Sequence, residues 1–243
     1  MIDTYDASGR ALRNYANAIV VSVEYRKAPE APFPAALYDA TDSYKWVIEN
    51  IGHYDGIGSK VAVAGESAVG NLATEVALVA KYENLQRPTH QLLIYPVTSG
   101  DLDQASDLLY TSSVLPLSTP ALPYFFKYYL PDPSLDTNPD VSPVDANLSN
   151  IAPATIIAAQ LDPLLSDGQA YAAKLKAAGS SVVYKLYPGT THEFLGMGAV
   201  VDQLKLLSNT GRRASLRRSE KRMPGRCEEI DNSLSKIGLS GTC

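Results

Sequence analysis

At 243 residues with 45% hydrophobic side chains, the chain is long enough for one large α/β domain, although length alone would also fit two small ones. It has no apolar run long enough for a membrane-spanning helix and does not open with the basic and apolar segments of a signal peptide, so we expect a cytoplasmic protein without a membrane span. Residues 1–208 hold 13 basic and 22 acidic side chains (net −9), and an acidic body argues against nucleic acid as the main partner.

Helix-length amphipathic segments alternate with strand-length apolar runs along most of the chain. In chain order, we expect a helix over 5–17, strand 18–25, helix 35–50, strand 60–66, helix 68–83, strands 90–97 and 154–161, helix 167–178, strand 181–187 and helix 198–208. This alternation is typical of an α/β fold with a mostly parallel sheet flanked by helices. Gly179 follows the fourth helix, and glycine readily adopts the left-handed backbone conformation that ends a helix.

Two segments depart from this pattern. Residues 98–153 are rich in Pro, Ser and Asp and contain an aromatic cluster over 124–129, which favours either a lid or binding loops inserted into the domain, or a helix packing its aromatic face onto the sheet. Residues 209–243 carry a net charge of +4 and include seven basic residues over 209–226. We expect a basic, largely disordered tail there, and a nucleic-acid-binding arm is the weaker interpretation because no aromatic residues are interleaved.

The first candidate for chemistry is Ser67, in V-A-V-A-G-E-S-A-V-G (residues 61–70). The pattern predicts a buried strand that runs into a tight turn with the serine at its tip and a helix beyond. Such a turn requires small neighbours, and Gly65, Ala68 and Gly70 meet that requirement. The backbone N–H of Ala68 would be the first donor to an oxyanion at the start of the helix. The alternative is an ordinary serine at a strand end in a glycine-rich turn.

Asp162 and His192 follow two other expected strands. Asp162 ends the apolar run 154–161, and we assign the neighbouring Asp167 to the alternative role of capping the next helix. His192 lies just beyond strand 181–187, whereas His53 and His90 are expected to be structural or solvated. Because strand ends of a parallel sheet meet at one edge, we expect the hydroxyl, carboxylate and imidazole to converge there.

Several quoted stretches carry a family resemblance. These are V-V-S-V-E-Y-R-K-A-P-E (20–30), F-P-A-A-L-Y-D-A (33–40), G-E-S-A-V-G-N-L-A (65–73), L-L-I-Y-P-V (92–97), V-S-P (141–143), L-D-P-L-L-S-D-G (161–168) and H-E-F-L-G-M-G (192–198). Together they resemble the bacterial hormone-sensitive lipase-like esterase branch of the α/β-hydrolases, over roughly residues 4–207. The order serine, aspartate, histidine is also typical of that fold.

The resemblance implies a serine carboxylesterase that hydrolyses short-acyl esters through Ser67, Asp162 and His192, with Ala68 in the oxyanion hole and neither cofactor nor metal. The expected partner is a small-molecule ester, with no nucleic acid, and a homodimer stays open. The alternative is a non-catalytic small-ligand-binding member of the same fold, as some plant relatives of this branch are hormone receptors.

Departures from the family pattern bear on the expected activity, besides the end of the match near Leu207. Val69 and Glu193 stand where the family has glycine, and crowding at Val69 would cost about 1–3 kcal/mol. The family's H-G-G-G segment, which supplies further oxyanion N–H groups, does not occur in this sequence, nor does the strand leading into it. We therefore expect an N-terminally incomplete hydrolase fold with impaired activity, since losing one oxyanion donor typically lowers the rate by about 10²–10³.

Overall fold

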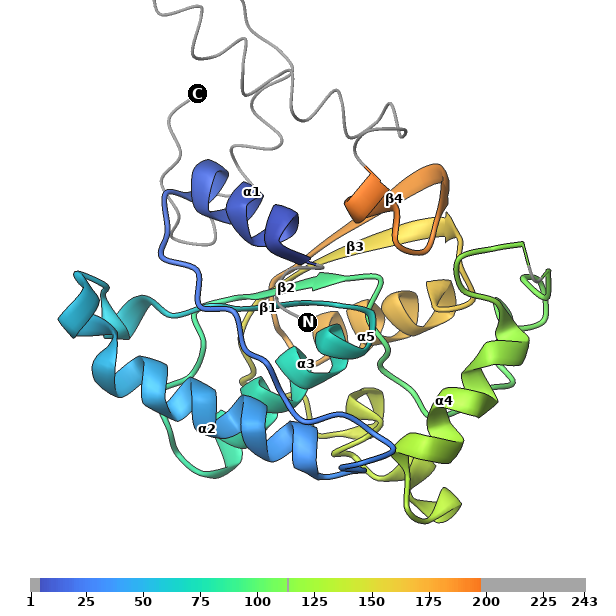
Figure 1. Cartoon of the computed structure of the whole chain (residues 1–243), viewed down its shortest axis with the longest axis horizontal. Coiled ribbons are helices and arrows are strands. Elements are labelled where there is room, and N and C mark those ends of the chain that lie inside the picture. Colours follow the sequence, from blue (N-terminus) through green and yellow to red (C-terminus); the bar gives the residue numbers. More distant parts are fainter. Residues whose placement is uncertain (1–4, 113, 198–243) are drawn as a thin grey trace, which may run out of the picture. The chain divides into compact units, whose positions relative to one another are not determined.

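The computed structural model describes residues 5–112 and 114–197 (Figure 1). They fall into two compact units, one of residues 25–192 and the other of residues 5–24 with 193–197. The helix expected over 198–208 and the basic tail 209–243 lie outside the described residues.

The larger unit is built on a four-stranded sheet of β1 (Val63–Glu66), β2 (Gln91–Ile94), β3 (Ala154–Leu161) and β4 (Val182–Thr191). The strand order is β1-β2-β3-β4, and every neighbouring pair is parallel. Four of the five expected strands therefore form. The prediction of an α/β fold with a parallel sheet and flanking helices is confirmed.

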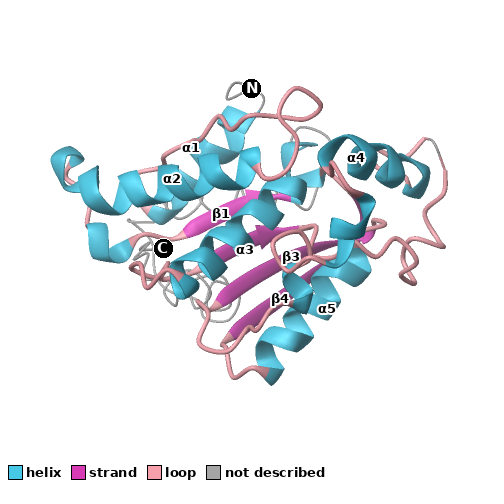
Figure 2. Ribbon diagram, turned by 90° about the horizontal axis from the view of Figure 1, so that it is seen from below, coloured by secondary structure: helices cyan, strands magenta, loops and turns pink. Residues whose placement is uncertain are grey.

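Two helices of the larger unit lie on one face of this sheet, α3 (Ser67–Tyr82) and α5 (Leu165–Ala177), as Figure 2 shows. Each connects two parallel neighbours, β1 to β2 and β3 to β4, in the same direction across the sheet. Right-handed crossovers place both helices on the same face for that reason. Their contact with the strands forms the main core, which includes Ala73, Ala77, Leu78, Leu93, Ala154, Ile156, Tyr171 and Leu175.

Helix α2 (Ala35–Asn50) covers α3 rather than the sheet. Leu37 clusters with Leu72 of α3, and Tyr44 clusters with Val76, so α3 is enclosed on two sides. This explains why α3 is almost entirely buried and why its sequence is apolar on more than one face.

The strand expected over 18–25 does not form. Residues 18–27 have no regular secondary structure, and the side chains of Ile19 and Val21 are half-exposed. An apolar, β-branched run favours extended backbone, but a strand also needs a neighbour that pairs with its N–H and C=O groups. Within the described part of the chain, β1 pairs only with β2 and is therefore the edge of the sheet.

The long connection between β2 and β3 contains α4 (Leu122–Tyr129), which carries the aromatic cluster. Tyr124, Phe125 and Tyr128 are exposed, and Tyr124 packs edge-on against each of the other two rings. A helix packing its aromatic face onto the sheet is thus the wrong interpretation for these three side chains. Tyr129 alone of the group makes an edge-on contact with Phe33.

The smaller unit contains α1 (Asp6–Ala16) and the short 3-10 helix Phe194–Met197, which contact each other. Helix α1 ends where Asn17 adopts a left-handed conformation, with φ of 48°. Throughout the described residues, no helix has both the length and the apolar character needed to cross a bilayer.

One residue of α3 conflicts with its surroundings. Glu75 is fully buried, and neither carboxylate oxygen has a hydrogen-bond partner among the described residues. Burial, and secondarily the negative charge of Asp140, raises the pKa of Glu75 well above its usual value. Because the folded-state pKa exceeds the unfolded one, the stability that protonated Glu75 permits is complete below the unfolded pKa and is lost as the pH rises through the folded pKa.

We therefore predict that Glu75→Gln reduces the fall in stability between pH 4 and pH 8 and raises the melting temperature at pH 8 by at least about 2–4 °C. Thermal unfolding followed by circular dichroism at the two pH values measures this. Glu49→Gln, on the exposed face of α2, is the matched control and should leave the pH dependence unchanged. Parallel pH profiles for wild type and Glu75→Gln would contradict the prediction.

Candidate active site

The three side chains singled out in the sequence follow three strands. Ser67 comes directly after β1, Asp162 directly after β3 and His192 directly after β4. Leu161 pairs with Thr191 at the ends of β3 and β4, so Asp162 and His192 leave the sheet side by side. A bulge sets this register, because the chain advances two residues from Ala159 to Leu161 on β3 but four from Tyr187 to Thr191 on β4.

Hydrogen bonds join the three groups in one chain. His192 Nδ1 lies 2.8 Å from Asp162 Oδ2, and His192 Nε2 lies 3.0 Å from Ser67 Oγ. The second carboxylate oxygen, Asp162 Oδ1, accepts the backbone N–H of Leu164 at 2.9 Å. Asp162 is fully buried and His192 is 4% exposed, so the bonds of the carboxylate are shielded from water, whereas Ser67 is partly exposed. The structure thus brings together all three side chains that the sequence indicated.

The turn at Ser67 is the strained one that the sequence predicts. Ser67 has a φ of 54°, in the left-handed region that non-glycine residues rarely adopt. A Cβ on Gly65 would lie 2.2 Å from the Val69 carbonyl oxygen, and one on Gly70 would lie 2.8 Å from Pro96. The close approach to Gly65 is therefore made by the Val69 backbone, and the Val69 side chain is only partly buried.

The start of α3 has the properties of an oxyanion site. The first N–H groups of any helix lack partners within the helix, and Ala68 belongs to this first turn. Glu66 occupies the N-cap position, but no side chain accepts a hydrogen bond there. These N–H groups and the positive end of the helix dipole are therefore available to a developing negative charge beside Ser67.

The other two histidines do not join the site. His53 is exposed, and His90 is buried with Nε2 2.9 Å from Thr155 Oγ1. Burial lowers the pKa of His90 to about 4, which keeps it neutral. Among the residues that the structure describes, no three His, Cys, Asp or Glu side chains gather closely enough to bind a metal ion.

Asp167 has a different role from the helix cap expected of it. It lies inside the first turn of α5, and its Oδ1 accepts the backbone N–H groups of Thr98 at 2.7 Å and Ser99 at 2.9 Å. Gln104 donates to its other oxygen at 2.8 Å, and burial raises the pKa of Asp167 to about 7. Asp167 therefore attaches the start of the 98–153 insertion to the segment that follows Asp162.

Tyr95 is a neighbour of the histidine that the sequence reasoning missed. It follows β2, has a φ of 35° and is 1% exposed. Its ring lies against the imidazole of His192, with 4.5 Å between centroids. The available signal was an aromatic residue directly before Pro96 at a strand end, but only the unusual φ turns that ring toward His192.

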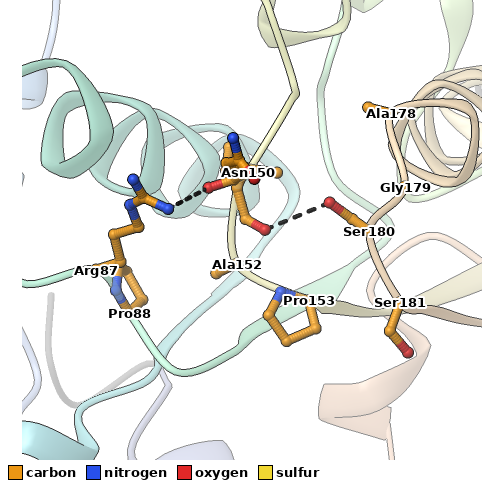
Figure 3. Close-up of a pocket in the computed structure, with 10 residues that line it drawn as sticks. Arg87, Pro88, Asn150, Ala152, Pro153, Ala178, Gly179, Ser180 and Ser181 are labelled. Atoms are coloured by element: carbon orange, nitrogen blue, oxygen red, sulfur yellow. Dashed lines mark hydrogen bonds between the residues drawn. The ribbon is translucent and has the colours of Figure 1, made fainter.

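A surface pocket, drawn in Figure 3, has a volume of about 460 Å³. It lies where the strands begin, at the opposite end of the sheet from Ser67, Asp162 and His192. It is lined by residues that precede β2, β3 and β4, among them Arg87, Asn150 and Ser180. Arg87 donates to the backbone carbonyl of Asn150, and Ser180 to that of Ile151. Because Ser67, Asp162 and His192 follow the strands, this pocket is separate from the candidate active site.

This combination of parallel sheet, strained serine turn and hydrogen-bonded acid and base defines the class of α/β-hydrolases. The chain matches the alpha/beta hydrolase fold family over residues 1–196 and belongs to that family.

Several of its relatives are named as ester hydrolases. It is 35% identical to an ethyl acetate hydrolase from Pseudomonas putida over 83% of this chain, and 37% identical to a carboxylesterase, NlhH, from Mycobacterium tuberculosis over 82%. The chain spans 64% of the length of each.

Solved structures of esterases have the same fold as this chain. A hyperthermophilic esterase from Pyrobaculum calidifontis superimposes with a TM-score of 0.84 at 32% identity, covering 98% of this chain and 73% of that one. The carboxylesterase EstE1 from a metagenomic library superimposes with a TM-score of 0.81 at 33% identity, covering 87% and 74%.

The glycine before the serine turn gives a direct test of that geometry. Gly65→Ala places a Cβ against the Val69 backbone, which cannot move without displacing Ser67, so we expect the reactivity of Ser67 toward a fluorophosphonate to fall by about 10²-fold or more. Labelling rates followed by mass spectrometry measure this. Gly52→Ala is the matched control, because its added Cβ meets nothing within 4 Å. Equal labelling of both variants would refute the tight contact.

Proposed function

We propose that the chain is a serine carboxylesterase that hydrolyses short-acyl carboxylic esters through Ser67, His192 and Asp162. The observation that carries this is the continuous hydrogen-bond chain from Ser67 Oγ through the imidazole to the buried carboxylate, at the edge where the strands end. Each group has the partner that its role requires, and the nucleophile stands on a turn built to expose it.

In the first half of the reaction, Ser67 Oγ attacks the ester carbonyl carbon while His192 Nε2 takes the hydroxyl proton. Asp162 accepts from His192 Nδ1–H, which keeps Nε2 unprotonated before the attack and stabilises the imidazolium that forms. The carbonyl oxygen becomes an oxyanion, for which the N–H of Ala68 is the available donor. The alcohol then leaves with the proton from Nε2, and the acyl group stays on Ser67.

In the second half, His192 takes a proton from water, and the resulting hydroxide attacks the acyl-enzyme at the same carbonyl carbon. The tetrahedral intermediate collapses, Ser67 Oγ recovers its proton from Nε2, and the carboxylic acid leaves. No cofactor enters either half. One imidazole therefore performs both proton transfers, which requires that it stay in one orientation throughout.

The substrate class rests on the relatives. One of them is named for ethyl acetate, an ester with a two-carbon acyl group, and others are named carboxylesterases. We propose further that the 98–153 insertion supplies substrate-binding loops. Its start is held to the segment after Asp162 through Asp167, and the side chains of Leu108 and Leu109 on it are largely exposed.

The proposal predicts that the chain hydrolyses p-nitrophenyl acetate and butyrate and that Ser67→Ala lowers the rate by at least about 10³-fold, because the nucleophile is lost. A fluorophosphonate should label Ser67 in the wild type. Turnover that survives Ser67→Ala would remove this serine from the mechanism. Binding of an ester without turnover or labelling would favour the non-catalytic ligand-binding alternative.

Asp162→Asn tests the role of the acid separately. The amide oxygen can keep the hydrogen bond from the Leu164 N–H, which turns the NH₂ group toward His192 Nδ1. Nδ1 must then accept, so the proton moves to Nε2, where it prevents deprotonation of Ser67. We predict a fall in kcat of about 10³–10⁴ with little change in melting temperature. Near wild-type turnover by a folded Asp162→Asn would contradict the assignment.

A further inference from the structure

We propose that Tyr95 is a positioning residue that ties the imidazole of His192 to the turn carrying Ser67, an inference that rests on the proposed esterase function. Tyr95 touches both partners through different parts of one rigid side chain. Its ring packs on the His192 imidazole, and its hydroxyl donates to Glu66 Oε2 at 2.7 Å. Glu66 directly precedes Ser67, so the contact spans from the base to the nucleophile's own turn.

The two hydrogen bonds of His192 restrain tilting of the imidazole out of its plane only weakly. Bonds at Nδ1 and Nε2 lie near the plane of the imidazole and fix it within that plane, but they resist tilting out of the plane only weakly. The Tyr95 ring lies 4.5 Å from the imidazole centroid with an interplanar angle of 51°, and it blocks this tilt on one side. The same ring would also stabilise the imidazolium that forms during acyl transfer, because its face attracts a cation.

The backbone around Tyr95 is held firmly enough for this role. Its N–H donates to the Ile157 carbonyl on β3 at 2.6 Å, although its φ of 35° departs from strand geometry. Two residues later, the N–H of Val97 donates to the Ser67 carbonyl at 3.2 Å. Such a strained residue persists only where its surroundings determine it, and strain of this kind gathers at functional sites.

If the role of Tyr95 were purely structural, the volume of its ring would suffice and Tyr95→Phe would keep the wild-type kcat. A second buried tyrosine is needed as a control. Tyr44 provides the comparison, because it is 5% exposed and its hydroxyl donates to the Gln86 carbonyl at 2.8 Å. It lies on α2 within a core cluster of α3 side chains and touches no member of the triad. Tyr44→Phe therefore removes a hydroxyl that also donates a hydrogen bond, from a similarly buried tyrosine, without affecting His192.

The experiment compares Tyr95→Phe, Tyr95→Leu and Tyr44→Phe in the full chain by two readouts. For p-nitrophenyl acetate we expect kcat to fall about 10-fold in Tyr95→Phe and about 100-fold in Tyr95→Leu, with KM within about twofold, because an imidazole out of place impairs the transition state more than substrate binding. Tyr44→Phe should keep the wild-type kcat. Glu66→Gln, which retains an acceptor oxygen for the Tyr95 hydroxyl, should lose less than Tyr95→Phe.

The second readout does not depend on turnover. In proton NMR, the low-field His192 Nδ1–H resonance should stay sharp in the wild type and in Tyr44→Phe, and should broaden or vanish in Tyr95→Leu. Wild-type kcat and an unchanged resonance in both Tyr95 variants would overturn the proposal, as would an equal loss in Tyr44→Phe.

The two readouts also separate this proposal from the proposed function. A wild type that neither hydrolyses esters nor reacts with a fluorophosphonate would contradict the function, while the resonance would still decide whether Tyr95 holds His192. If Tyr95→Leu does not fold, Tyr95→Phe decides the question by the same two measurements.

Discussion

The candidate active site depends on one imidazole, which is held between a buried carboxylate and a serine hydroxyl. His192 bonds to Asp162 at 2.8 Å and to Ser67 at 3.0 Å, and the two partners lie 95 residues apart in the sequence. A parallel sheet brings such distant residues together, because all its strands end on the same side. The pairing of Leu161 with Thr191 then decides which residues of β3 and β4 meet beyond that edge.

Three turns that follow strands have unusual backbone geometry, whereas the other described non-glycine residues with positive φ are all Asn or Asp. Ser67, Tyr95 and Glu193 follow the ends of β1, β2 and β4, and each has a positive φ although none is glycine. Glu193 stands where the resemblance led us to expect glycine, and its φ of 63° explains why glycine suits the position. Residues strained in this way persist where the surrounding structure determines their conformation.

The sequence predicted those parts of the fold and site that depend on local patterns. Apolar runs located β1 to β4, their ends located Ser67, Asp162 and His192, and the G-x-S turn indicated the strained serine. The errors arose where a distant part of the chain decides. Residues 18–25 have strand character but do not join the sheet that the structure describes, and Asp167 has the position of a helix cap but bonds to Thr98 and Ser99 instead. The burial of Glu75 likewise depends on distant segments that pack around α3, among them those carrying Asp140 and Tyr129, which no local pattern indicates.

The five residues that follow β2 explain why the missed contacts matter together. Because β2 lies between β1 and β3, the chain that leaves it passes between the serine turn and the segment after Asp162. It contacts both, through the Tyr95 hydroxyl to Glu66, the Val97 N–H to the Ser67 carbonyl, and the Thr98 and Ser99 N–H groups to Asp167, while the Tyr95 ring covers His192. The same residues open the insertion proposed to bind substrate. Movement of that insertion would therefore act on the turn of Ser67 and on His192 through a single short segment.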